Sequence, residues 1–313
     1  MSHVHVVTGA GPVGSAVAQQ LADAGRKVRL LTRSGSGPVH PLIDRRRVDV
    51  SQPDALVEVF DGAVAVHHCI HGSSYDVRVW RAELPRAERA VLDAAGRVGA
   101  VVVFPESLYS YGPVDRPITE DLPRAATTGK LGVRTELLAQ REASATPTVS
   151  VAASDFYGPL VRNAHAGERM VPTVLAGRTM RVLGSLDQPH SFTYVPDLAA
   201  AMITAAGRED LWNTFLHAPT APAVTQRRLV ELTAQTAGVP VPRMSAIPPW
   251  VLRASGVVSR DMRELAETSY MFTDPFVLDS SASEARLDLA PTPMDVGLAA
   301  TVTWWRQREH AAA

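Results

Sequence analysis

The sequence has a single cysteine, almost no excess of either charge and no long apolar run. Cys69 alone excludes an internal disulfide framework and is typical of a reducing compartment, so we expect a cytoplasmic protein. The 31 basic and 32 acidic residues give a net charge of −1, which argues against nucleic acid or an anionic membrane as a partner. No apolar run approaches the roughly 20 residues that span a bilayer.

What the sequence does contain is an alternation of valine-rich strands and amphipathic segments. The 313 residues, 46% of them hydrophobic, can bury a large core. The expected strands are Val4–Val7, Lys27–Leu31, Arg47–Val50, Ala63–Ile70, Ala100–Phe104 and Thr148–Ala152. Strands and helices that alternate in this way predict an α/β protein with a Rossmann-type doubly wound parallel sheet.

Beyond Phe156 the alternation weakens and prolines become frequent, which predicts a smaller C-terminal substrate-binding region. We expect residues 1–156 to form the dinucleotide-binding domain, completed by 191–217. Residues 157–190 and 218–313 are expected to form the substrate-binding region, with a terminal helix over Pro291–Arg308. The basic run 45–47 is expected to lie in a solvated loop.

A glycine turn, VTGAGPVG, follows the first strand and leads into a helix. Its three glycines match G-x-G-x-x-G, in which the first permits a tight turn, the second lets the backbone approach a pyrophosphate, and the third packs helix on strand. The residues expected to hold a dinucleotide here are Gly9, Gly11, Pro12, Val13 and Gly14. A turn that only packs is the alternative.

The end of the second strand lacks the acidic residue that an NAD-specific site places at the ribose 2′-hydroxyl. Arg33 and Ser34 stand there instead, and a guanidinium group pairs bidentately with phosphate oxygens. We therefore expect NADP(H) to be favoured over NAD(H), with an exposed loop arginine as the alternative. Asp49, followed by Val50, is expected either to reach the adenine or to be an ordinary acid before a helix.

Further motifs follow the glycine turn in a fixed order. They are Asp49-Val50, AVAVHHCI, VVVFPESLYSYG, SDFYGP and FTYVPDLA. In this order they resemble the extended short-chain dehydrogenase/reductase superfamily, and most closely its atypical, epimerase/dehydratase-like members. The resemblance implies that Cys69, Ile70 and His71 lie beneath the cofactor ribose and diphosphate. It also implies a homodimer formed through two helices of each subunit.

The resemblance breaks at the proton donor, which in the family is the tyrosine of Y-x-x-x-K. No tyrosine occurs between residues 113 and 156. The resemblance places Ser107 at the substrate oxygen. Lys130 and Arg134 share a helical face, so a cation remains near the position of the family lysine. We expect Tyr109, close to Ser107 in sequence, to replace the missing acid.

Aromatic residues occur in the loops that the resemblance assigns to the substrate. They are Tyr75, Trp80, Phe156, Tyr157, Phe192, Tyr194 and Trp250. Together they favour an apolar or aromatic small molecule over a sugar nucleotide. His67 and His68 are neighbours on a strand and point to opposite faces, so no metal site is expected.

The sequence thus predicts an NADP(H)-dependent oxidoreductase. It would act as a reductase or dehydrogenase on a carbonyl, alcohol or activated double bond of a small apolar or aromatic molecule. One alternative is a cofactor-bound epimerase or isomerase, in which oxidation and re-reduction occur at one site. The other is a non-catalytic, NmrA-like redox sensor that binds NADP(H), an interpretation that the missing tyrosine favours.

Overall fold

A computed structural model describes residues 3–53, 56–248, 250, 251, 254 and 259–312. Its central feature is a seven-stranded parallel sheet in the order β11-β6-β5-β4-β1-β2-β3. The strands are β1 (Val4–Thr8), β2 (Lys27–Thr32), β3 (Ile43–Arg47), β4 (Ala63–His68), β5 (Val101–Ser107), β6 (Thr148–Ala153) and β11 (Thr214–His217). The order reverses between β1 and β4, as in a Rossmann-type doubly wound sheet. The predicted fold class is confirmed.

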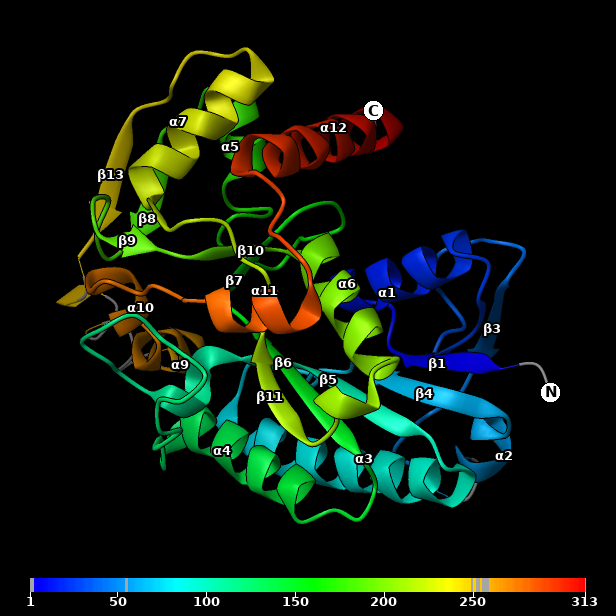
Figure 1. The fold of residues 1–313 in the computed structure, drawn as a ribbon. Coiled ribbons are helices and arrows are strands. Elements are labelled where there is room, and N and C mark those ends of the chain that lie inside the picture. The colour runs from blue at the N-terminus through cyan, green and yellow to red at the C-terminus, as the bar shows by residue number, and fades with distance from the viewer. Residues whose placement is uncertain (1–2, 54–55, 249, 252–253, 255–258, 313) are drawn as a thin grey trace.

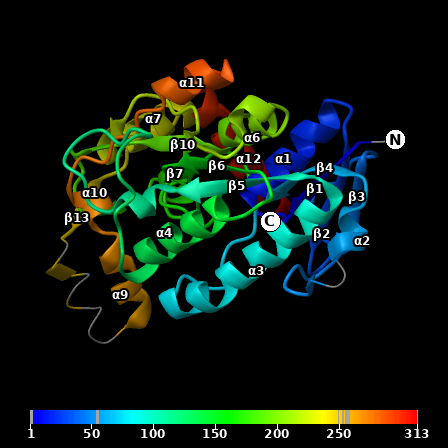
Figure 2. The ribbon, with the colours of Figure 1, turned by 60° about the horizontal axis from the view of Figure 1, so that its bottom comes forward.

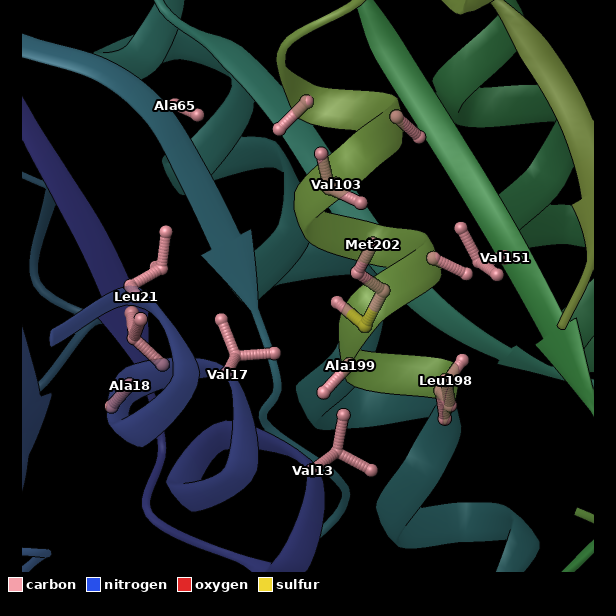
Figure 3. Close-up of a cluster of buried hydrophobic side chains, with 14 of the residues drawn as sticks. Val13, Val17, Ala18, Leu21, Ala65, Val103, Val151, Leu198, Ala199 and Met202 are labelled. Atoms are coloured by element: carbon pink, nitrogen blue, oxygen red, sulfur yellow. The ribbon is translucent and has the colours of Figure 1, made fainter. Parts of the chain in front are cut away.

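Helices cover both faces of the sheet (Figure 1). On one face lie α1 (Pro12–Asp23) and α6 (Val195–Ala206), and on the other lie α2 (Leu56–Phe60), α3 (Val77–Val98) and α4 (Gly129–Glu142). Val103 and Val151 pack beneath α1 and α6 (Figure 3), whereas Val102 and Phe104 pack beneath α3. Both faces of these strands are buried, which explains why the sequence shows continuous valine-rich runs.

The third strand was predicted wrongly as Arg47–Val50 and is instead Ile43–Arg47. The run 45–47, expected in a solvated loop, therefore belongs to a strand, and its arginine side chains are exposed. β3 lies at the edge of the sheet, and only Ile43 of its five residues is buried. A strand with so little buried surface lacks the apolar pattern on which the prediction depended.

Short elements after residue 153 form the C-terminal region. Its strands pair in twos: β7 (Asp155–Tyr157) with β10 (Phe192–Tyr194), β9 (Pro189–His190) with β12 (Val224–Thr225), and β8 (Met180–Leu183) with β13 (Met244–Ile247). Its helices are α5 (Val171–Leu175), α7 (Gln226–Ala237), α9 (Arg260–Glu267), α10 (Tyr270–Thr273), α11 (Ser281–Leu287) and α12 (Met294–Ala312). A second view places α9 beside α4 (Figure 2).

Two 3₁₀ turns, η2 (Leu108–Tyr111) and η3 (Glu209–Leu211), complete the described elements. A separate hydrophobic core joins α5, α7 and α12, whereas α6 and β11, both within 191–217, pack with the main sheet.

The predicted terminal helix is present as α12. The division into domains stays a prediction. None of the helices in the described ranges is both long and apolar enough to cross a membrane.

Candidate active site

The glycine turn joins β1 to α1 at the edge where the strand order reverses. Gly9 has a φ of +88°, a conformation that favours glycine. A Cβ on Gly14 would overlap the carbonyl oxygen of Gly9, so α1 can lie this close only with glycine there. A Cβ on Gly11 would meet no atom within 4 Å. Pro12 begins the helix and Val13 is buried behind it. The open side at Gly11 and the amides of the helix N-terminus fit a diphosphate.

The residues predicted for the adenosine end are mostly on the surface. Arg33 and Ser34 follow β2 and are exposed. Asp49 is exposed two residues beyond β3, and it accepts hydrogen bonds from the backbone amide and hydroxyl of Ser51. These bonds, and to a smaller extent the charge of Arg33, lower the pKa of Asp49. Arg33 therefore lies within electrostatic range of a carboxylate. Val50 is buried.

The loop after β4 lies against the glycine turn, as the family resemblance implies. A Cβ on Gly9 would contact the carbonyl oxygen of Cys69, and one on Gly14 would contact the Cys69 side chain. Burial raises the pKa of the Cys69 thiol, which therefore stays protonated. Ile70 and His71 continue this loop toward α3. That these residues contact a cofactor stays a prediction.

Ser107 ends β5 at the same edge of the sheet, and the cation beside it is Arg134 of α4. Nε of Arg134 donates to Oγ of Ser107 over 3.3 Å and lies 2.7 Å from Oε1 of Glu106, whose side chain is 0% exposed. Burial alone would raise the pKa of Glu106, but the guanidinium groups of Arg134 and Arg141 outweigh it and lower the pKa. An ionised carboxylate thus holds a cation next to Ser107.

Arg141 extends this ion pair into a buried network between α3, β5 and α4. Its guanidinium group donates to Glu88 over 2.6 and 2.8 Å, to Glu106 over 2.7 Å and to the Ser150 hydroxyl over 3.0 Å. The Arg141 side chain is only 3% exposed. Two arginines therefore balance two buried carboxylates. The network holds α4 against the sheet and so fixes the position of Arg134.

Lys130, the predicted catalytic lysine, is directed toward the C-terminal region. Its ammonium group bonds to the carbonyl oxygen of Glu264 at 2.8 Å, to the Glu264 carboxylate at 2.5 Å and to the Glu267 carboxylate at 2.7 Å. An ammonium group has three donors, so these bonds occupy all of them. Lys130 therefore ties the start of α4 to α9 and has no donor left for Ser107 or a cofactor.

Tyr109 lies in η2, and its backbone amide donates to the Ser107 hydroxyl. Its own hydroxyl is 2.8 Å from the hydroxyl of Tyr75, and its ring stacks on Trp80. Burial, followed by the charge and hydrogen bond of Tyr75, raises the pKa of Tyr109 well above its ordinary value. The phenol keeps its proton at neutral pH and is suited to donating a hydrogen bond. Its assignment as the proton donor stays a prediction.

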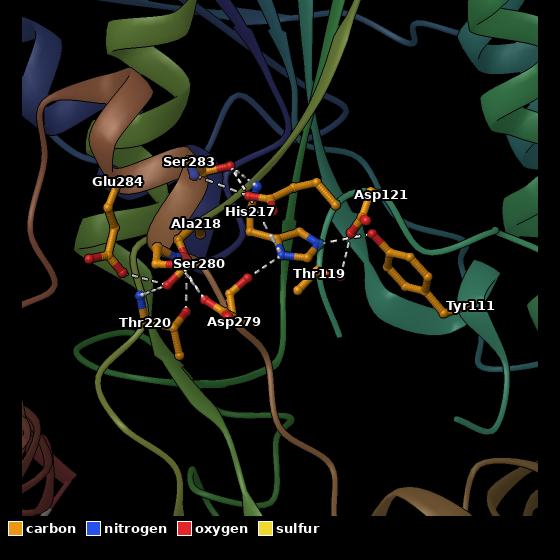
Figure 4. Close-up of polar contacts among 12 residues, drawn as sticks. Tyr111, Thr119, Asp121, His217, Ala218, Thr220, Asp279, Ser280, Ser283 and Glu284 are labelled. Atoms are coloured by element: carbon orange, nitrogen blue, oxygen red, sulfur yellow. Dashed lines mark hydrogen bonds and ion pairs between the residues drawn. The ribbon is translucent and has the colours of Figure 1, made fainter. Parts of the chain in front are cut away.

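The next tyrosine along the chain, Tyr111, forms a buried hydrogen bond with His217 (Figure 4). Its hydroxyl lies 2.9 Å from Nε2 of His217, whose Nδ1 is 2.8 Å from the carbonyl oxygen of Asp279. Since a carbonyl only accepts, Nδ1 carries the proton and Nε2 accepts from the tyrosine. The His217 amide also donates to Ser283 of α11. These bonds fasten α11 to the end of β11.

The aromatic residues predicted for the substrate are not gathered in one cleft. Tyr75 and Trp80 pack with Tyr109 between α3 and η2. Tyr157 is fully buried, and its ring centroid lies 5.2 Å from that of Tyr194. These are two separate clusters, one beside the main sheet and one in the core of the C-terminal region. Contact of any of them with a substrate stays a prediction.

Phe192 lines a cavity of about 340 Å³ in the C-terminal region. His165 and Arg169 contribute polar groups to its wall, which also includes residues of α5, β8, α7 and β13. Of the remaining predicted aromatic residues, Phe156 packs on the core beneath α6 and Trp250 is 65% exposed. One predicted substrate residue therefore lines a hollow that a small molecule could enter.

Sequence reasoning missed two groups, the buried carboxylate of Glu106 and the pair formed by half-buried Asp155 with buried His190. Nε2 of His190 lies 2.7 Å from Oδ2 of Asp155. The available signal was a charged residue inside or directly after an apolar strand, as in VVVFPES and VAASDF. Such residues are rarely buried without a partner. The partners could not be found because they lie on other elements.

The strand order and the glycine turn define a Rossmann-type α/β protein. Comparison with known families shows which family of this class the chain belongs to. The model of the NAD dependent epimerase/dehydratase family matches residues 5–213, more than half of the 313 residues. The chain therefore belongs to the NAD-dependent epimerase/dehydratase family, which confirms the resemblance expected from the sequence. Comparison with curated proteins found no match.

Solved structures with this fold cover nearly the whole chain. MoeE5 in complex with UDP-glucuronic acid and NAD is 23% identical over 97% of this chain and 99% of its own, with a TM-score of 0.74. UDP-glucose 4-epimerase of Thermus thermophilus, in complex with NAD, is 20% identical over 97% and 99%, with a TM-score of 0.75. UDP-N-acetylglucosamine 4-epimerase of Methanobrevibacter ruminantium is 18% identical over 98% and 100%, with a TM-score of 0.77. At these identities the likeness shows the fold.

The expectation that NADP(H) is favoured over NAD(H) is wrong, because MoeE5 and the Thermus enzyme were solved with NAD. The structure gives a physical reason why Arg33 is a poor guide. Its charge lowers the pKa of two exposed carboxylates, Asp49 and Glu83, although hydrogen bonds from Ser51 and Ser73 act more strongly on them. Arg33 is exposed and its charge also acts on these two carboxylates, so its position after β2 does not by itself indicate a 2′-phosphate.

Proposed function

We propose that the protein is an NAD-dependent enzyme that oxidises a secondary alcohol of a small molecule and returns the hydride at the same site, as an epimerase or isomerase does. The observation that carries this proposal is the position of the glycine turn and Ser107 on one edge of a parallel sheet, on either side of β4. Ligands of open α/β sheets bind at this edge, where the strand order reverses. The likeness to epimerase structures supports the proposal.

NAD, when bound, accepts a hydride from a substrate carbon and can return it. In this chain Gly9, Gly11 and Gly14 would hold its diphosphate. Ser107 would donate a hydrogen bond to the substrate oxygen, and Arg134 would orient that hydroxyl while favouring negative charge on the oxygen. Tyr109 would donate a second hydrogen bond from a phenol that keeps its proton.

Three outcomes separate the candidate functions. The protein is titrated with NAD by calorimetry and then incubated with UDP-glucose, UDP-glucuronic acid, UDP-N-acetylglucosamine and a set of aromatic secondary alcohols. An epimerase converts one compound to its stereoisomer without net release of NADH, which NMR of the product detects. Stoichiometric NADH would indicate a dehydrogenase instead. Tight NAD binding with no conversion would contradict the proposal.

A non-catalytic cofactor-binding protein is the second candidate, and one observation favours it. The three donors of Lys130 are all occupied by α9, and no tyrosine stands between residues 113 and 156. Two of the groups on which the family's chemistry depends are therefore absent or engaged elsewhere. The conversion assay described above decides between the two candidates.

We predict that Arg134→Gln lowers turnover by about 100-fold, the usual cost of losing one group that stabilises developing negative charge. NAD affinity should change little, because Arg134 is placed at Ser107 and not at the glycine turn. Steady-state kinetics with the compound converted in the panel measures this effect. Lys130→Gln is the matched control on the same helix, and we expect it to change turnover less than about tenfold. A larger effect of Lys130→Gln would return the catalytic cation to Lys130.

A further inference from the structure

The contact between Asp155 and His190 requires one proton more than a neutral imidazole beside a carboxylate would supply. Nδ1 of His190 is 2.8 Å from the carbonyl oxygen of Met271, which can only accept, so Nδ1 carries a hydrogen. Nε2 is 2.7 Å from Oδ2 of Asp155. A carboxylate also only accepts, and one more proton must therefore lie in this contact. The pair holds either an imidazolium beside a carboxylate or a neutral imidazole beside a carboxylic acid.

The surroundings protect this proton from water. His190 is 2% exposed, and its ring stacks on Phe272, with centroids 4.8 Å apart and planes inclined by 10°. Phe192 and Phe276 pack against the same ring. Phe192 also lines the 340 Å³ cavity, to whose wall neither His190 nor Asp155 contributes. An ion pair in an apolar surrounding costs free energy unless it is well bonded, and here both ring nitrogens of His190 are bonded.

Asp155 also lies on the side of the proposed active site. It follows β6 by two residues, and Ala153 at the end of β6 is in register with Ser107 of β5. Its negative charge contributes to the raised pKa of Tyr75 and of Tyr109, although burial contributes more. The Asp155 side chain is 20% exposed. Among the residues that the structure describes, no hydrogen-bond donor is bonded to its second oxygen, Oδ1.

We propose that Asp155 is the acid–base group of this site and that His190 is the positioning residue that holds its proton. The proposal rests on the proposed function. When the substrate alcohol is oxidised, its O–H bond breaks and the proton passes to Oδ1 of Asp155, while the hydride leaves the carbon for NAD and the alcohol becomes a ketone. On re-reduction the ketone oxygen takes the proton back from Asp155. Asp155 thus does the work of the tyrosine that this chain lacks.

The charged and titratable groups that face the pair come from several elements. His165 and Arg169 stand between β7 and α5, and Tyr75 and Tyr109 stand before α3 and in η2. Burial by itself would raise the pKa of Asp155, but the hydrogen bond and the charge of His190 lower it. Burial lowers the pKa of His165 to about 4, so that ring is neutral at neutral pH. Of the two histidines, His190 is the one bonded to the Asp155 carboxylate, so the additional proton lies in the contact between His190 and Asp155.

The first test needs no substrate. Protein labelled with ¹⁵N-histidine and loaded with NAD is examined by NMR, and the signals are assigned with His190→Gln and His165→Gln. At neutral pH we expect both ring nitrogens of His190 to be protonated and His165, the internal control, to be neutral. Asp155→Asn should remove the second proton of His190, whereas Asp197→Asn, at a carboxylate bonded to Thr292, should not. A singly protonated His190 in the wild type would overturn the proposal.

The second test uses the compound converted in the panel. We expect Asp155→Asn to lower turnover by about 10²–10⁴-fold, the range for loss of a general acid or base, and Asp155→Glu to restore part of it. Tyr109→Phe should cost about tenfold or less, since it removes one neutral hydrogen bond. The opposite order would overturn the proposal and make Tyr109 the proton donor. If no compound reacts, the proposed function fails, and the NMR result still decides where the proton lies.

Discussion

Gly11→Val is expected to lose NAD binding while the protein folds normally. A side chain at this position would meet no protein atom within 4 Å, so the variant has no steric reason to unfold. Gly11 precedes α1 with a φ of −69°, which valine also adopts. The valine methyl groups would instead fill the space through which a diphosphate approaches the helix amides. We expect affinity to fall at least about 100-fold, or about 2.8 kcal/mol.

Calorimetry with NAD measures the loss, and urea unfolding of the same sample checks the fold. Gly14→Ala is the informative comparison, because its new Cβ would overlap the Gly9 carbonyl oxygen. That variant should lose about 1–3 kcal/mol of stability, the usual cost of overpacking. The two variants should therefore differ. Gly11→Val is expected to lose NAD binding and keep its stability, whereas Gly14→Ala is expected to lose stability. Unchanged NAD affinity in Gly11→Val would place the cofactor elsewhere.

Arg141→Met is expected to give the largest loss of stability, about 3–5 kcal/mol, because removing one partner leaves buried carboxylates uncompensated. Among the described residues, Arg141 is the only cation bonded to Glu88, and it also bonds Glu106. Methionine fills a similar volume, so the effect is electrostatic rather than a cavity. Urea unfolding at neutral pH measures the loss.

The pH dependence of this effect has a definite sign. The pKa of Glu106 is lowered in the folded protein, so its ionised form contributes stability above its unfolded pKa and loses it as the pH falls through its folded pKa. The wild type and Arg141→Met should therefore become more alike in acid. Arg46→Met, which breaks a half-exposed pair with Asp44, should cost less than about 1 kcal/mol. Equal stability of Arg141→Met and Arg46→Met would show that the network does not hold α4.

The sequence was informative where one local pattern sets the structure. Buried parallel strands and the glycine turn depend on short-range patterns, and both were predicted correctly. β3 was misplaced because an edge strand with one buried residue has no such pattern. The direction of Lys130 could not be predicted either, because it depends on glutamates more than 130 positions away on α9.

The same limit applies to the proton-bearing groups. Asp155 and His190 are 35 positions apart, and their contact depends on the parallel pairing of β7 with β10 and on the loop that places Met271. The family motif could show that the usual tyrosine is missing, because that is a property of one segment. It could not show what replaces it, since the replacement is a contact between segments.

The bond between Lys130 and α9 has a consequence for how the protein can be divided. A shortened chain that ends at residue 248 would keep the whole seven-stranded sheet but would leave the Lys130 ammonium group without its two carboxylates. Without α9 the ammonium group would also lose its cover and the hydrogen bonds that join α4 to the C-terminal region, so we expect the shortened chain to be less stable than the whole protein. We therefore expect the C-terminal segment to contribute to the stability of the sheet and the two parts of the chain to unfold together.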